Sequence, residues 1–268
     1  MPKHKILVGT SGFSFPDWVG TVYPANIKKE EMLTNYQEHL KMETVEINST
    51  YYSLIRQKTI ENMMNRTGPE FKFAVKAYKG ITHEFTGKDQ DERIRDIENF
   101  RFTIAPLSQS HKLIAVLLQF PYSFRPGQKS LDYLLFLRDK FPEELVVEFR
   151  NIAWHKDNYY EFLKKNNLGY CVVDEPKLKG LLPFNPIATS ETGYFRFHGR
   201  NQEWFDSSSV SERYNYDYSD QELQYFVRFV KGLSGKVSLL TTFFNNCHLG
   251  AALRNAQRFK QLLSDAGQ

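Results

Sequence analysis

Four side chains with the chemistry of general acids and bases share one position in the local sequence pattern. Each closes a short apolar segment, and the four are Glu46, Glu148, Asp174 and His198. Burial in a partly dry pocket raises the pKa of a carboxyl group toward neutrality, where histidine already titrates. The pattern therefore predicts acid–base catalysis by these four residues, with a structural salt-bridge network as the alternative.

Cationic and amide side chains close or follow the other apolar segments. The cations are Lys76, Arg150, Arg196 and Arg200, and the amides are Asn48, Gln119, Asn245 and Asn246. A planar guanidinium group can bind a carboxylate or a phosphate through two parallel hydrogen bonds. We therefore expect these eight side chains to bind a small anionic substrate.

Eight apolar segments of strand length must position these groups. We predict strands at Lys5–Thr10, Glu43–Asn48, Phe71–Lys76, Leu113–Gln119, Leu145–Arg150, Gly169–Asp174, Tyr194–Gly199 and Val237–Asn245. Helix-like stretches separate most of them, which is typical of a parallel sheet. Polar groups confined to the carboxyl ends of the strands indicate a (β/α)8 barrel, because active sites lie at that end. No change in amino-acid composition along the chain indicates a domain boundary, so we expect a single domain over residues 1–268.

Strand alternation predicts which side chains share the barrel interior, since residues two apart lie on one face of a strand. Three inward pairs follow: Glu46 with Asn48, Glu148 with Arg150, and Arg196 with His198. Phe195 and Phe197 would then point outward to the helices. The polar groups are therefore expected to meet in one pocket.

Two C-terminal segments have the clearest helical period. Leu223, Phe226, Val227 and Val230 recur at the spacing of one helix face, and Gly232 is the expected stop. The last helix is expected to carry one apolar stripe of Leu249, Ala252, Leu253, Ala256, Phe259 and Leu263. The segments after Asp174 and after His198 lack this period. We predict long loops after strands six and seven, both on the C-terminal face.

Aromatic residues make up 15% of the chain and are candidates for the walls of the pocket. We assign Tyr52 and Trp154, which follow the second and fifth predicted strands, to substrate binding. Further candidates are Tyr51, Trp204, Tyr214, Tyr216 and Tyr218. Aromatic rings beside arginines suit a nucleobase or a sugar ring. For Phe13 and Trp18 we favour ordinary packing.

The composition narrows the class of protein. The net charge of +4 suits anionic substrates but lacks the dense basic stripe of a dedicated nucleic-acid binder. Cys171 and Cys247 have no metal-ligand spacing, which favours a reducing compartment. The apolar run Ile6–Val8 is too short for a signal peptide, and no run approaches the roughly 20 residues that span a bilayer. We expect a cytoplasmic protein without membrane contact.

Motifs along the whole chain are similar to those of one known family. They are VGTSGFSFPDW at 8–18, TVEINSTYY at 44–52, FAVKA with ITHE at 73–84, LLQFPYSF at 117–124, VVEFRNIAWH at 146–155, VVDEPK at 172–177, YFRFHGRN at 194–201 and FFNNCHLGAALRNA at 243–256. In these motifs the chain resembles the YecE-like family, also called domain of unknown function 72. The resemblance implies a TIM barrel but no reaction, since that fold hosts many chemistries. Asn151 departs from it, because the family often has histidine there.

The sequence favours an enzyme for a small phosphorylated or carboxylated substrate, and it leaves hydrolase, lyase and isomerase chemistry open. Barrels of this kind often bind phosphate on the loops after strands seven and eight, which here begin at His198 and Asn245. Gly199 and Gly250 would let the backbone approach a ligand, and a helix starting near His248 would offer free N–H groups. Capping of that helix by Asn246 is the alternative. The cofactor and the oligomeric state stay unknown.

Two other functions remain open. The first is a nucleic-acid binder or metal-dependent phosphodiesterase, which would use the net positive charge and the aromatic loops. Its metal ligands would come from the four acid–base candidates, with His83 and His155 as additional ligands. Neighbouring lysines and arginines compete for those carboxylates, so we assign no metal ligand. A non-catalytic metabolite-binding protein would use the same polar groups without chemistry.

Overall fold

Eight parallel strands form a closed barrel in the computed structural model, which describes residues 5–207 and 210–266. The strands are β1 (Lys5–Ser11), β2 (Thr44–Ile47), β3 (Lys72–Lys76), β4 (Leu113–Gln119), β5 (Leu145–Glu148), β6 (Gly169–Asp174), β7 (Thr192–Phe197) and β8 (Leu239–Phe244). Each strand pairs with the next, and β8 pairs with β1 to close the ring. The predicted (β/α)8 barrel is confirmed.

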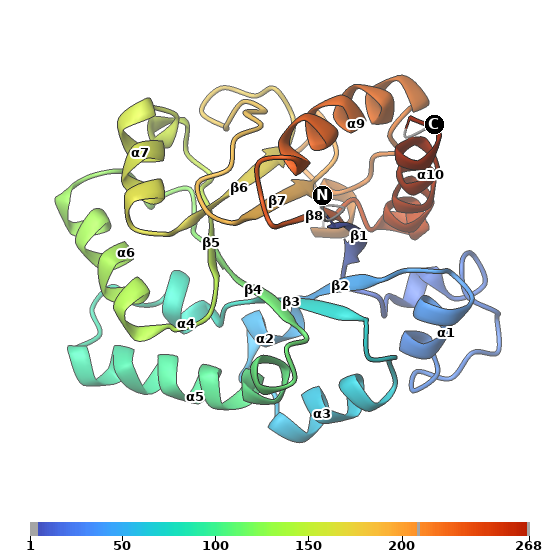
Figure 1. The fold of residues 1–268 in the computed structure, drawn as a ribbon, viewed down its shortest axis with the longest axis horizontal. Coiled ribbons are helices and arrows are strands. Elements are labelled where there is room, and N and C mark those ends of the chain that lie inside the picture. Colours follow the sequence, from blue (N-terminus) through green and yellow to red (C-terminus); the bar gives the residue numbers. More distant parts are fainter. Residues whose placement is uncertain (1–4, 208–209, 267–268) are drawn as a thin grey trace.

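Helices surround the barrel in an outer ring (Figure 1). The longer ones are α1 (Met32–Glu38), α3 (Gln57–Asn65), α5 (Gln90–Gln109), α6 (Gln128–Lys140), α7 (Asp157–Lys165), α9 (Asp220–Ser234) and α10 (Ala251–Asp265). Short ones lie in the connections: η1 (Pro16–Trp18), α2 (Ser49–Tyr52), α4 (Lys79–Thr82), η2 (Ile152–Trp154), α8 (Val210–Arg213) and η3 (His248–Gly250). Residues 175–191 form a long loop without a helix, and the described residues between β7 and α9 (198–207 and 210–219) form another that contains α8. Both predicted loops are confirmed.

Strand alternation places side chains as the sequence predicts. Phe197 points outward, where its ring centroid lies 4.7 Å from that of Phe226 on α9 and 5.8 Å from that of Phe259 on α10. Its neighbour Arg196 points inward and is 2% exposed. Because the outward rings fill the space under the helices, the polar groups of β7 are left facing the barrel interior.

Several predicted boundaries were wrong by one or two residues. β2 ends at Ile47, β5 at Glu148 and β7 at Phe197, so Asn48, Arg150 and His198 lie just beyond their strands. Asn48 is the residue before α2, and the backbone leaves the sheet there. These residues therefore stand on the rim of the barrel rather than within the sheet.

Two predictions for the last helices were wrong. Helix α9 runs through Gly232 and ends at Ser234, because its four apolar residues Leu223, Phe226, Val227 and Val230 are joined in the buried face by Leu233. Leu249 does not belong to the stripe of α10. It lies in η3 with φ of 46° and is 50% exposed.

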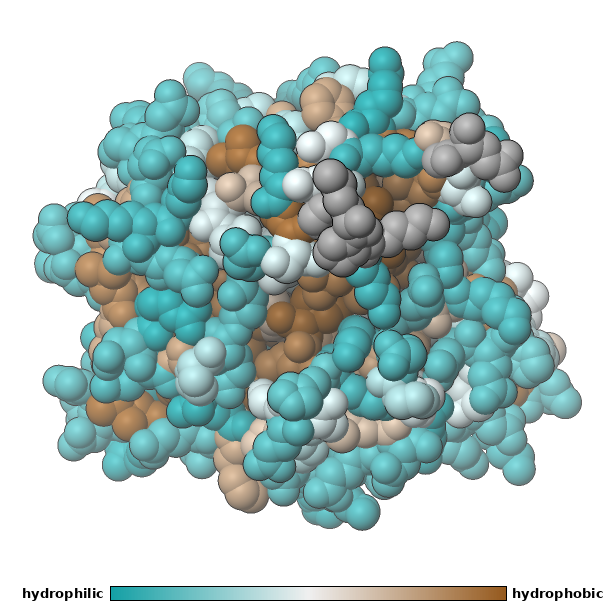
Figure 2. Space-filling view, viewed as in Figure 1, coloured by the Kyte–Doolittle hydropathy of each residue, from teal (hydrophilic) through white to brown (hydrophobic). Residues whose placement is uncertain are grey.

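Hydrophobic residues gather in the centre of the face shown in Figure 2, and hydrophilic residues surround them. Beneath the surface, residues of the barrel such as Leu7, Val116 and Leu240 are fully buried. Within residues 5–207 and 210–266, no helix has the length and apolar character needed to cross a membrane.

The two long loops are held firmly against the rest of the fold. In the loop after β6, the Leu182 amide donates to Glu175 Oε1 at 3.0 Å, and the Ile152 amide donates to the Gly180 carbonyl at 2.9 Å. In the loop after β7, Trp204 is 4% exposed, and the Arg150 guanidinium lies 5.9 Å from its ring centroid. Both loops therefore form part of the C-terminal end of the barrel, which we call the mouth.

Candidate functional site

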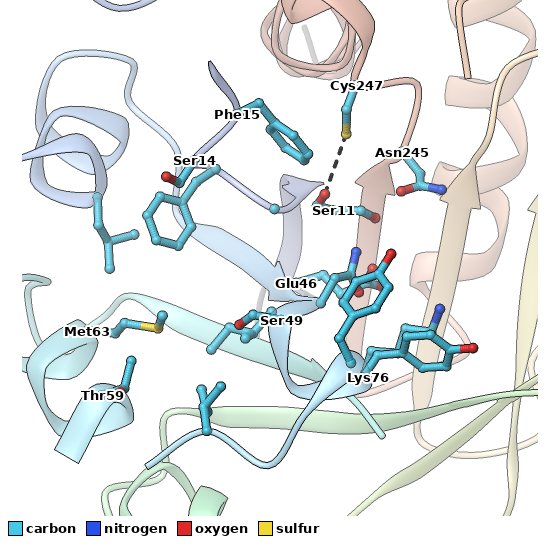
Figure 3. Close-up of a pocket in the computed structure, with 18 of the residues that line it drawn as sticks. Ser11, Ser14, Phe15, Glu46, Ser49, Thr59, Met63, Lys76, Asn245 and Cys247 are labelled. Atoms are coloured by element: carbon cyan, nitrogen blue, oxygen red, sulfur yellow. Dashed lines mark hydrogen bonds between the residues drawn. The ribbon is translucent and has the colours of Figure 1, made fainter. Parts of the chain in front are cut away.

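A cavity of about 900 Å³ opens at the mouth on the side of β1, β2 and β3. At its inner end lie Ser11, Glu46, Lys76, Arg150, Arg196 and Asn245, which come from the ends of four strands and from the turns after β5 and β8. The cavity extends outward between the segment after β1, with Ser14 and Phe15, and helix α3, with Thr59 and Met63 (Figure 3). Parallel strands bring these side chains together because all of their carboxyl ends meet at one end of the barrel.

Arg196 lies at the centre of a buried ion network under this cavity. Its Nη1 donates to Glu148 Oε2 at 2.5 Å, and its Nη2 donates to Glu46 Oε1 at 2.8 Å and to Ser11 Oγ at 3.4 Å. The Tyr194 hydroxyl donates to Glu46 Oε2 at 2.7 Å. Both carboxylates are fully buried, so this pairing offsets a desolvation cost that would otherwise be severe.

Arg150 adds a second cation to the same network. Its Nη2 lies 2.7 Å from Glu148 Oε1, and its Nη1 lies 3.4 Å from Glu175 Oε2. Burial alone would raise the pKa of Glu148, but the guanidinium groups of Arg150 and Arg196 hold it well below its usual range. Burial raises the pKa of Glu175 to about 7 against the opposing charge of Arg150. Glu148 is therefore a permanent anion, whereas Glu175 can exchange a proton near neutral pH.

His198 is a buried neutral histidine in this arrangement. One ring nitrogen, Nδ1, is 2.9 Å from Asn245 Nδ2, and the other, Nε2, is 3.3 Å from Glu148 Oε1. Burial, assisted by the charge of Arg150, lowers the pKa of His198 to about 3. His198 is fully buried and does not line the cavity, although its partner Asn245 does. The geometry favours a supporting role for this side chain, and its predicted catalytic role remains a prediction.

Lys76 differs from the other cations at the mouth. Within the described parts of the chain its amine has no hydrogen-bond acceptor or carboxylate partner, and it lies 4.1 Å from the centroid of the Tyr51 ring. Burial and the nearby charge of Arg196 lower the pKa of Lys76 to about 7. Its side chain lines the cavity (Figure 3). The cavity therefore contains an amine that can gain or lose a proton at neutral pH.

Buried polar atoms without a hydrogen-bond partner are concentrated at the mouth. They include Arg150 Nε, Arg196 Nε and Asn48 Oδ1, all from side chains that line the cavity. Glu148 Oε1 and His198 Nε2 are also unpartnered, because their short contacts are poorly aligned for hydrogen bonds. Unpartnered buried groups are rare in folded proteins, and at an active site they are often satisfied by a ligand.

Asp174 and Arg200 form a separate network beside the cavity. Arg200 donates from Nε and Nη2 to both oxygens of Asp174 at 2.7–3.0 Å, and its Nη1 donates to Glu222 Oε1 at 3.1 Å. The Tyr218 hydroxyl also donates to Asp174, at 2.7 Å. Neither Asp174 nor Arg200 lines the cavity. This network ties the loop after β7 to β6 and to the first turn of α9.

Three other predicted site residues have structural partners. Gln119 donates to the Phe120 carbonyl at 2.7 Å, and Trp154 stacks on Phe149 at 4.0 Å between ring centroids. Asn246 donates to the Tyr216 carbonyl and to Asn255. Tyr52 does line the cavity, where it is 68% exposed. The cavity thus gathers Glu46, Asn48, Tyr52, Lys76, Arg150, Arg196 and Asn245 from the predicted set, and it leaves out Gln119, Glu148, Trp154, Asp174, His198, Arg200 and Asn246.

The helix start near His248 is occupied by a side chain of the protein. Asp17 accepts a hydrogen bond from the Leu249 amide at 2.6 Å. Gly199 and Gly250, with φ of 85° and 77°, adopt backbone conformations that suit glycine, and a Cβ would lie 2.6–2.7 Å from Tyr216 or Val22. Turn geometry and packing therefore account for both glycines without a bound phosphate. Asn246 does not cap the helix, since Cys247 precedes η3 without a side-chain cap.

The sequence pattern did not single out Tyr194 and Glu175. Tyr194 lies two residues before Arg196, so the alternation rule that placed Arg196 also places this hydroxyl inside the barrel. Glu175 follows the end of β6, and only the fold of the next loop turns it toward Arg150. The first could have been found from the sequence, whereas the second depends on the loop conformation.

A metal centre has no obvious place in this site. Within residues 5–207 and 210–266, no cluster of three or more His, Cys, Asp or Glu side chains is arranged to hold a metal ion. Glu46 and Glu148 are paired with Arg196, and Asp174 is paired with Arg200. His83 and His155 contact Thr82 and Tyr160. Because arginines hold the carboxylates, the donor set does not fit a divalent cation.

Comparison with known proteins shows the family and the fold. The curated relative UPF0759 protein YunF of Bacillus subtilis (strain 168) is 29% identical over 96% of this chain and 94% of its own length. The crystal structure of a DUF72 family protein from Thermotoga maritima MSB8 superposes with a TM-score of 0.91 at 44% identity, covering 97% of this chain and 100% of that one. A DUF72 family protein from Enterococcus faecalis V583 gives a TM-score of 0.84 at 28% identity, covering 97% and 95%.

More distant structures share the fold alone. D-psicose 3-epimerase from Clostridium cellulolyticum H10 has a TM-score of 0.53 at 10% identity, covering 97% of this chain and 98% of that one. The family model described as "Protein of unknown function DUF72" matches residues 7–268. With that match over nearly its whole length, the chain belongs to the DUF72 family.

Proposed function

We propose that this protein is an enzyme that binds a small carboxylated or phosphorylated substrate in the cavity at the mouth of the barrel. The observation that carries the proposal is the set of unpartnered cationic donors on one cavity: the Lys76 amine, Arg150 Nε and Arg196 Nε. An anion placed among them would supply the missing acceptors. Charge-assisted hydrogen bonds of this kind contribute about 1.5–3 kcal/mol each.

The balance of charge supports an anion over a neutral ligand. Arg196 is neutralised by Glu46 and Glu148, and Arg150 shares Glu148 with it. Lys76 has no carboxylate partner within the described residues, so no direct ion pair neutralises this amine when it is protonated. A carboxylate or phosphate of the substrate would neutralise the protonated Lys76 amine, because an unpaired charge in a partly dry site is costly.

Lys76 and Glu46 are the groups best placed for proton transfer. A catalytic acid or base works best when its pKa lies near the operating pH, and that of Lys76 is lowered to about 7 by burial and by Arg196. Glu46 is the one predicted catalytic carboxylate that lines the cavity, and Arg196 and Tyr194 fix its orientation. Proton transfer between such groups and a bound anion suits an isomerase, a lyase or a hydrolase.

The proposal is tested by binding and turnover on the same protein. Calorimetric titration with sulfate and with inorganic phosphate should show one site, and Lys76→Met should weaken it by about tenfold or more. Lys79→Met is the matched control, because Lys79 pairs with Glu84 and does not line the cavity. Equal affinity of the wild-type protein and Lys76→Met would refute the anion site.

Turnover is tested with panels of phosphorylated and carboxylated metabolites followed by nuclear magnetic resonance. Glu46→Gln and Lys76→Met should each remove any conversion that the wild-type protein supports. A ligand that binds at this site but is never converted would instead indicate a non-catalytic metabolite-binding protein.

A further inference from the structure

We propose that the substrate is amphipathic, with an anionic head among Lys76, Arg150 and Arg196 and an apolar tail between helix α3 and the segment after β1. The position of the head rests on the proposed function. The tail rests on a different part of the cavity, whose lining includes the hydrophobic side chains of Phe15, Leu33 and Met63.

The outer part of the cavity has apolar side chains on both sides, and on the α3 side they lie among polar ones. Phe13, Phe15 and Leu33 come from the segment after β1 and from α1, and Ile55 and Met63 come from the segment before α3 and from α3 itself. Figure 3 shows Phe15 and Met63 on opposite sides of this space. Open space between these apolar side chains leaves apolar surface uncovered, and a hydrocarbon or aromatic group would cover it.

Helix α3 presents one complete face to the cavity. Thr59, Asn62 and Met63 of the helix line it together with Arg66 just beyond the helix end, and the four follow the spacing of a single helix face. Elsewhere α3 is fixed by the fold, since Ile60 is fully buried and the Gln57 side chain donates to the Phe102 carbonyl of α5 at 3.0 Å. Because α5 anchors α3, the helix cannot simply close the gap, and the space persists as part of the site.

The size of the cavity supports the same conclusion. A metabolite of about ten non-hydrogen atoms fills roughly 300 Å³ if each atom takes the volume of one liquid water. The cavity of about 900 Å³ is several times larger. At the outer end, the exposed side chains of Lys29, Glu30 and Arg66 also line it, which indicates an opening to solvent there. A tail can therefore extend from the buried head toward the surface.

The test is a series of straight-chain alkyl phosphates, from two to about ten carbons, titrated calorimetrically below their micelle-forming concentrations. If the tail occupies the outer part of the cavity, the affinity for the alkyl phosphate should rise about fourfold for each added methylene until that space is filled. Equal affinity for alkyl phosphates of all chain lengths, with inorganic phosphate still bound, would overturn the proposed tail site and leave the anion site intact. Failure of every member to bind, inorganic phosphate included, would overturn the proposed function itself.

Met63→Gln locates the tail, and Met64→Gln is the matched control. Both are half-buried methionines of α3, but only Met63 lines the cavity. Met63→Gln should weaken the longest ligands by about tenfold and leave inorganic phosphate unchanged, since it places a polar amide against the hydrocarbon. An unchanged dependence on chain length in Met63→Gln, or an equal loss in Met64→Gln, would overturn this location. Thermal unfolding of both variants checks that they fold.

Discussion

The amine of Lys76 lies 4.1 Å from the centroid of the Tyr51 ring, and no carboxylate of the described residues lies within ion-pair distance of it. The aromatic face favours the protonated amine, whereas burial and Arg196 favour the neutral one and lower its pKa to about 7. These opposing effects leave the amine able to change its charge at physiological pH. An anion entering the cavity would shift it to the protonated form.

Anion binding above neutral pH should therefore be coupled to proton uptake. At pH 8 the free protein has mostly neutral Lys76, so binding of sulfate should take up close to one proton, and affinity should fall as pH rises through 7. Titrations in buffers of different ionisation enthalpy measure this uptake. Lys76→Met should remove most of it and leave only the share that Glu175, the partner of Arg150, contributes. A wild-type protein that takes up no proton would contradict the assignment.

The same amine should make stability depend on pH. Its pKa is about 7 in the folded protein and 10.5 ordinarily, so the cost of burying the charged form is complete below pH 7 and is relieved as pH rises toward 10.5. Lys76→Met should therefore stabilise the protein most below pH 7. We expect a gain on the order of 2 kcal/mol in the free energy of unfolding, which is less than the full effect of the pKa change because Lys76 contacts solvent in the cavity. Urea unfolding at pH 6 and pH 9.5 checks this, and a larger gain at the higher pH would contradict it.

The fold could be predicted from the sequence because two of the sequence patterns that indicate it lie within single strands. The alternation of Arg196 with Phe197 and the polar ends of the strands follow directly from strand geometry. The composition of the cavity could not be predicted, because it depends on which mouth residues find partners within the protein. Asp174 and Arg200 satisfy each other, and Trp154 is covered by Phe149, whereas Lys76 has no such partner. Loop conformation decides these pairings, and the strand pattern contains no information on it.

Glu148 should contribute more to stability than any surface carboxylate. It is fully buried between Arg150 and Arg196, so Glu148→Gln removes the carboxylate that both guanidinium groups share and leaves Glu46 and Glu175 as their remaining anions. We expect a loss of about 3–5 kcal/mol in the free energy of unfolding. Glu61→Gln is the control, because Glu61 pairs with Lys58 on the surface of α3 and should cost less than about 1 kcal/mol. Similar losses in the two variants would contradict the buried network.

Asp174→Asn and Glu46→Gln separate the structural network from the cavity. Asp174 holds Arg200 and Tyr218 beside the cavity, so Asp174→Asn should lower the free energy of unfolding by about 2–4 kcal/mol and leave sulfate affinity within about twofold. Glu46 lines the cavity as an anion paired with Arg196. Its replacement by neutral glutamine frees positive charge for the ligand and should raise sulfate affinity severalfold. Urea unfolding and calorimetric titration of the two variants measure both quantities. A strong loss of sulfate binding in Asp174→Asn would place Asp174 in the binding site, as its position at the end of β6 first predicted.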